Sequence, residues 1–213
     1  MTAPVSYRQL SQDRWDEFIA VCYFGGRKAG DWLDRCIRRA YLDMSRTLYG
    51  MAAFGRTHPG WQTSMACLLK QQLRVLTQSA EWTQQGFDSW HEACVASLQD
   101  LSDSLGYIDD ERPSRRRFTV GQAQKWINMS IKYAIALGES RVPGFRSVYG
   151  VAHAPLDSIV LSCLKDQASA SWSRTDEYRQ YMRYEESLRQ SYPGRTMLEI
   201  EYQIWQDAME HAD

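Results

Sequence analysis

The 213-residue sequence lacks several features that would define its class directly. No apolar run approaches the roughly 20 residues that a membrane span needs, and the N-terminus has neither the charged start nor the apolar segment of a signal peptide. The five cysteines are widely spaced and include no Cys-x-x-Cys pair, which argues against a disulfide framework and a zinc knuckle. We therefore expect a cytoplasmic protein that does not enter a membrane.

The common catalytic and cofactor motifs are also missing. The four histidines are scattered, no His-Glu-x-x-His occurs, and the Walker phosphate loop, Gly-x-Gly-x-x-Gly and Gly-x-Ser-x-Gly are absent. The glycine-rich stretch 25–30 has neither the spacing nor the preceding strand of a phosphate loop. We expect no metal and no cofactor, and the question of whether the chain is an enzyme stays open.

The sequence has the composition and periodicity of a helical globular protein. Hydrophobic residues make up 44% of it, which is enough for one substantial core. They recur at intervals of three and four, between residues that typically begin and end helices. We predict one all-α domain over residues 1–213, a bundle of about eight helices, with helical halves 1–111 and 112–213 as the alternative division.

Cap residues and helix breakers indicate where these helices lie. The predicted helices cover residues 12–24, 31–54, 60–79, 87–105, 119–137, 155–163 and 173–192, and a last one starts at Thr196. In the first of them, one face carries Trp15, Phe18, Ile19 and Cys22. The stretch 139–153 is longer than a usual connection between helices, which favours a functional loop.

Positive charge is concentrated in one segment. Residues 1–111 carry 11 basic and 14 acidic residues, residues 112–146 carry 8 and 1, and residues 147–213 carry 6 and 11. The middle segment can attract an anion, or it can pair with its acidic flanks.

The helix predicted over 119–137 lies inside this segment. Its apolar residues cover the wider arc, which leaves a narrow polar strip for contact with water. Three arginines precede the helix, and Gly121 in its first turn leaves backbone amides uncovered, as at an anion site. We predict binding of a phosphate-bearing ligand, with nucleic acid as the first choice, through Arg115, Arg116, Arg117, Gln124, Lys125, Asn128 and Lys132. The alternative is a solvated helix face whose charges pair within the chain.

Three segments of the C-terminal half resemble, in the same order, blocks of a set of uncharacterised bacterial all-α proteins. They are Gly121-Gln-Ala-Gln-Lys-Trp-Ile-Asn128, His153-Ala-Pro-Leu-Asp157 and Trp172-Ser-Arg174. The resemblance brings no activity with it, but it draws attention to His153 and Asp157. For Asp157, near the start of a helix, we expect a capping role.

A catalytic alternative rests on Arg146 and His153. Their separation resembles the Arg-x4-6-His motif of the HEPN superfamily of α-helical ribonucleases. The resemblance implies a metal-independent ribonuclease, in which His153 transfers protons and Arg146 or Lys125 stabilises the developing negative charge.

A third hypothesis makes the chain a protein interaction module, including a phage-related or defence-related adaptor. Its aromatic and arginine side chains would then dock a protein partner. The sequence leaves the oligomeric state and the pathway open.

Overall fold

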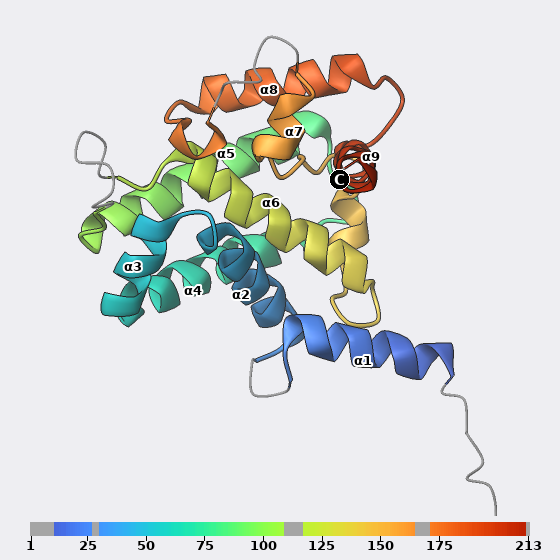
Figure 1. Ribbon diagram of the computed structural model, residues 1–213, viewed down its shortest axis with the longest axis horizontal. Coiled ribbons are helices and arrows are strands. Elements are labelled where there is room, and N and C mark those ends of the chain that lie inside the picture. Colours follow the sequence, from blue (N-terminus) through green and yellow to red (C-terminus); the bar gives the residue numbers. More distant parts are fainter. Residues whose placement is uncertain (1–10, 27–29, 109–116, 165–170, 212–213) are drawn as a thin grey trace, which may run out of the picture.

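The computed structural model describes residues 11–26, 30–108, 117–164 and 171–211. These residues form nine α-helices and two short 3₁₀ turns without a strand, so the all-α prediction is confirmed (Figure 1). The elements are α1 (Gln12–Phe24), α2 (Trp32–Ser45), α3 (Tyr49–Thr57), α4 (Pro59–Leu76), α5 (Gln84–Ser104), α6 (Val120–Leu137), η2 (Phe145–Val148), α7 (Ser158–Ser162), η3 (Trp172–Arg174), α8 (Tyr178–Ser191) and α9 (Met197–Glu210). No described helix is long and apolar enough to cross a membrane.

Local sequence signals set several helix ends as predicted. Thr119 and Thr196 each form a capping box with the glutamine or glutamate three residues on, at the starts of α6 and α9. Pro59 occupies the first turn of α4. Gly106 follows α5 with a positive φ of 72°, a backbone conformation that glycine adopts without strain.

The helix predicted over 31–54 is two helices, α2 and α3. The hydroxyl of Thr47 donates to the carbonyl of Met44 and the amide of Leu48 donates to that of Ser45, so the chain turns after α2. The turn directs Leu48 into the core, where it is buried. The turn hydrogen bonds and the buried Leu48 stabilise a break that the continuous helical pattern does not reveal.

Three predicted helix starts differ from the structure: α5 begins three residues earlier than expected, and α7 and α8 begin later. The segment before α7 is extended, because the carbonyls of Ala154, Pro155 and Leu156 accept hydrogen bonds from side chains of α6. The segment before α8 forms the turn η3, which packs on the start of α6. Tertiary contacts with α6 thus hold both segments out of a helix.

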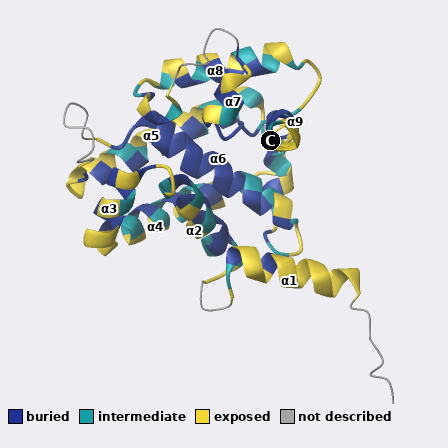
Figure 2. Ribbon diagram, viewed as in Figure 1, coloured by how far each residue is buried: buried dark blue, intermediate teal, exposed yellow. Residues whose placement is uncertain are grey.

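The helix α6 runs through the centre of the molecule. It contacts α2, α5, α8, η2 and η3, and Figure 2 shows it buried along almost its whole length. The indole of Trp126, fully buried, donates to the carbonyl of Ile37 on α2 at 2.9 Å. The helix α1, in contrast, extends from the body at the blue end of the chain and is mostly exposed (Figures 1 and 2).

Candidate functional site

The polar strip of α6 does not face water, which corrects the expectation from the sequence. Gln124, Lys125 and Asn128 are buried, and the side chain of Lys132 is 30% exposed. The strip lies under the extended segment 152–157 and against α8 and α9, which supply polar partners. Periodicity located the strip correctly, but it cannot distinguish water from the polar atoms of another element.

Both lysines of the strip are neutralised within the molecule. The ammonium of Lys125 lies 2.7 Å from a carboxylate oxygen of Asp157 and 3.3 Å from the carbonyl of Pro155. Asp157 also caps α7 by accepting from the amide of Val160, so its expected capping role is confirmed. Lys132 contacts both carboxylate oxygens of the buried Glu201 at 2.6 and 2.7 Å.

The N-terminus of α6 is not an open anion site either. The amide of Gly121 donates to the carbonyl of Thr175 at 2.9 Å, and the amide of Gln122 donates to the hydroxyl of Thr119. Arg115 and Arg116 lie outside the described residues, and Arg117 forms an ion pair with Asp103. The positive end of the helix is therefore covered by the chain itself.

The strip forms part of a buried hydrogen-bond network that begins at His91 on α5. Nε2 of His91 lies 3.1 Å from the amide oxygen of Asn128, which can only accept, so this nitrogen carries the proton. Nδ1 lies 2.9 Å from the phenol oxygen of Tyr178, whose hydroxyl also donates to the carbonyl of Asp88 at 3.2 Å. Burial lowers the pKa of His91 well below its usual value, so the imidazole is neutral at pH 7.

The hydrogen-bond network continues through Asn128 to the surface. The amide nitrogen of Asn128 donates to the phenol of Tyr181, which lies 2.8 Å from Nδ1 of His153. Nε2 of His153 lies 2.7 Å from the carboxylate of Asp88, whose side chain is 29% exposed. Burial acts to raise the pKa of Asp88, but the hydrogen bond from His153 and a second one from Gln84 outweigh it and lower the pKa.

One buried acid in this region, Glu185, receives hydrogen bonds from the described part of the chain at only one of its two carboxylate oxygens. Glu185 on α8 is fully buried, and one of its oxygens accepts from the amide of Ala154 at 3.3 Å. The other oxygen has no hydrogen-bond partner among the described residues. Burial therefore raises the pKa of Glu185 to about 7.

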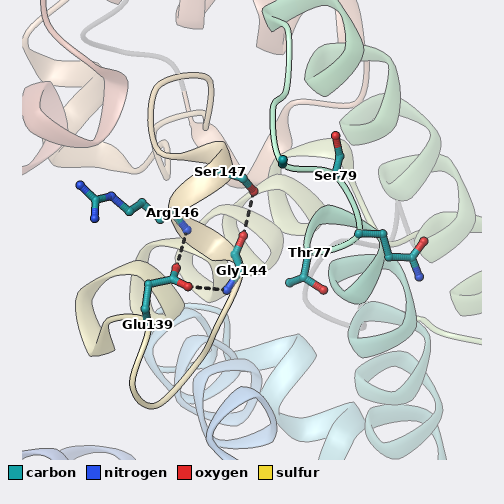
Figure 3. A pocket seen from close by; sticks show the side chains of 8 residues that line it. Thr77, Ser79, Glu139, Gly144, Arg146 and Ser147 are labelled. Atoms are coloured by element: carbon teal, nitrogen blue, oxygen red, sulfur yellow. Dashed lines mark hydrogen bonds between the residues drawn. The ribbon is translucent and has the colours of Figure 1, made fainter.

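Arg146 and His153 lie in different surroundings, one exposed and the other buried. Both ring nitrogens of the buried His153 are engaged, by Tyr181 and Asp88, so neither is turned toward a substrate. Arg146 is exposed in the irregular stretch 139–153, at a pocket of about 600 Å³ that also includes Thr77, Ser79 and Glu139. Figure 3 shows its guanidinium pointing away from Thr77 and Ser79, while its backbone amide donates to Glu139.

Two surface features lie outside the predicted anion and catalytic sites. The first is the apolar stripe of α1, formed by Trp15, Phe18, Ile19 and Cys22. The second is a pocket between α2 and α3 that is lined by Arg39, Arg46 and Arg56. The sequence predicted the apolar face of α1. It did not reveal the pocket, because the pocket forms between α2 and α3, which were predicted as one helix. Among the described residues, no group of His, Cys, Asp or Glu is arranged to hold a metal ion.

Comparison of the chain with protein-family models, with curated proteins and with solved structures gave no match.

Proposed function

We propose that the protein is an interaction module whose helix α1 docks into an apolar groove of another protein. Among the three hypotheses from the sequence, this one is supported by a feature on the described surface. The observation that carries it is an apolar helical stripe that faces away from the other residues that the structure describes.

The four stripe residues stand at positions i, i+3, i+4 and i+7 of α1. At 100° per residue they cover about 100° of the helix surface, and this spacing is that of helices that bind in a groove. Trp15 is 44% exposed, Phe18 57% and Ile19 59%. Large apolar side chains that are exposed as one continuous patch indicate a binding surface.

The opposite side of α1 is fixed to the body. Ala20 and Phe24 are buried there, and the ring of Phe24 packs edge-on against Tyr133 of α6 with centroids 5.4 Å apart. The phenol of Tyr23 donates to Asp43 at 3.1 Å, and Glu17 forms an ion pair with Arg141. These contacts hold the stripe outward, so it is presented to a partner.

The charges that border the stripe are mixed. At 100° per residue, Arg14 lies beside one edge of the stripe and Asp16 beyond the other, whereas Glu17 lies on the body side and is paired with Arg141. The apolar side chains of the stripe therefore dominate what α1 offers to a partner. A second copy of the chain is a poor fit, because its matching stripe is convex, whereas a groove encloses the stripe from both sides and buries more of it.

Size-exclusion chromatography with an extract of the source cells tests the proposal. The double variant Phe18→Ala/Ile19→Ala removes two anchors, and truncation of such anchors weakens binding at least about tenfold. Tyr202→Ala/Met209→Ala is the matched control, because it removes two exposed apolar side chains of α9.

We expect one defined partner to co-elute with the wild type and the control but not with the α1 variant. A partner retained by all three proteins would contradict the proposal. A dimer of the purified chain that only the α1 variant loses would also contradict it, since the stripe would then bind a second copy.

A further inference from the structure

A second, independent surface feature lies between the C-terminal half of α2 and the helix α3. It is a pocket of about 380 Å³, within the size range of small-molecule sites. Arg39 and Arg46 come from α2 and its end, and Arg56 comes from α3. Asp43 is the acidic residue among the side chains that line it.

The carboxylate of Asp43 already accepts hydrogen bonds from four side chains of the protein. Its carboxylate accepts from Nε of Arg39 at 2.8 Å and from Arg46 at 2.5 Å. It also accepts from the phenols of Tyr133 at 2.7 Å and Tyr23 at 3.1 Å. Hydrogen bonds from Arg39 and the two tyrosines outweigh the effect of burial, so the pKa of Asp43 is lowered and it is a carboxylate at neutral pH.

The pocket keeps an excess of positive charge and of donors. Three guanidinium groups face one carboxylate, and each guanidinium has five N–H donors. Arg46 has a side chain that is 70% exposed, and Arg56 is exposed and forms no ion pair with any residue that the structure describes. A phosphate carries up to two negative charges at pH 7 and matches the fork of an arginine.

The same pocket has an apolar rim. Tyr49, at the start of α3, is 70% exposed, and Leu42 of α2 is partly exposed beside the arginines. An exposed aromatic ring next to a cationic surface is the arrangement on which nucleic-acid bases stack. The rim therefore adds a flat apolar surface to the anion site.

We propose that this pocket binds a nucleoside phosphate, with the phosphate on Arg46 and Arg56 and the base on Tyr49. The ligand is either a free nucleotide or a nucleotide of a single strand, which share this chemistry. Arg39 positions Asp43, through which α1 and α2 are also joined. The proposal does not depend on the partner of α1, because the stripe residues do not line the pocket.

Isothermal titration of the purified protein at low salt tests the proposal with ADP, pyrophosphate, adenosine and a short single-stranded RNA. We expect ADP to bind more tightly than pyrophosphate, and adenosine to bind far more weakly than either. Arg56→Gln should weaken ADP about tenfold, as expected for the loss of one charged contact. Arg38→Gln is the control, because it removes the same charge from an exposed position of α2 outside the pocket.

The remaining measurements distinguish a free nucleotide from a nucleotide of a single strand, and they can contradict the proposed site. Tyr49→Ala should reduce the affinity for ADP to that for pyrophosphate. RNA that displaces ADP identifies a single strand as the source, whereas RNA that leaves ADP bound identifies a free nucleotide. No binding of ADP, an equal effect of Arg38→Gln and Arg56→Gln, or an unchanged affinity in Tyr49→Ala would overturn the proposal.

Discussion

Lys125 is buried on α6, and its partner Asp157 comes from an element 32 residues further along the chain. Removing water from two charges is costly, and the loss of one partner leaves an unpaired charge in the interior. The lysine and the aspartate therefore have to be considered as one unit.

Lys125→Met should lower the free energy of unfolding by about 3–5 kcal/mol, because the carboxylate of Asp157 then stays buried without its cation. Urea unfolding measures the loss. In Lys125→Met/Asp157→Asn, the asparagine is uncharged and can still cap α7, so most of the stability should return. A double variant as unstable as the single one would show that the unpaired charge is not the cause.

Glu185 should make stability depend on pH. Its pKa rises from 4.5 to about 7 on folding, so the folded protein binds an extra proton between these values. The stabilisation is full below pH 4.5 and is lost as the pH rises through about 7. Glu185→Gln mimics the protonated acid, so the stability difference between the variant and the wild type should increase by about 3 kcal/mol over this range.

The same urea series at several pH values also provides the control. Glu186→Gln changes an exposed neighbour on α8, and it should leave the pH dependence of the wild type unchanged. If Glu185→Gln follows the wild type in parallel from pH 4 to pH 8, Glu185 does not titrate with a raised pKa.

The side chains of the predicted anion site show why residues are harder to place than helices. The sequence correctly grouped Gln124, Lys125 and Asn128 on one arc of a helix. It could not show that Asp157 and Tyr181 cover this arc, since both belong to distant elements. Helical periodicity reports which residues share a face, and only the tertiary fold decides what covers that face.

Helix ends are set partly by neighbours in sequence and partly by neighbours in space. The capping box of Thr119 and Gln122 involves residues of one turn, which is why the start of α6 could be predicted. The start of α8 could not be predicted in this way. Ser173, where the sequence predicted the helix to begin, instead accepts a hydrogen bond from Thr119 through its carbonyl.

The contact between η3 and α6 requires a glycine. A Cβ on Gly121 would lie 1.7 Å from the carbonyl oxygen of Trp172, a backbone atom that cannot move independently. Gly121→Ala should therefore destabilise the protein by more than about 3 kcal/mol, at or above the upper end of ordinary overpacking. Thermal unfolding measures this effect.

Gly60→Ala is the matched control for that substitution. Gly60 also lies near the start of a helix, α4, but nothing stands within 4 Å of its added Cβ. We expect it to be neutral or to gain about 0.5–1 kcal/mol from reduced freedom of the unfolded chain. Equal effects of the two substitutions would mean that the carbonyl of Trp172 does not cover Gly121.

The complete molecule combines a body with a buried polar interior and a helix that offers its apolar side outward. The sequence predicted an all-α protein and the face of α1, because both follow from local periodicity. It could not predict that no described residue covers this face, while the polar face of α6 is covered. Which face of a helix packs on the body depends on where every other helix lies.

Cysteine reactivity in the complete chain gives the most direct test of docking by α1. Cys22 lies in the stripe, and Cys67 and Cys163 are exposed elsewhere, so they serve as internal references. Burial raises the pKa of Cys36 and Cys94 to about 12, so both should stay unreactive at neutral pH.

Maleimide labelling followed by mass spectrometry measures each thiol, in the free protein and in the complex recovered from extract. We expect labelling of Cys22 to slow strongly in the complex while Cys67 and Cys163 react as before. If Cys22 reacts equally fast in the free and the bound protein, the stripe is not the docking surface.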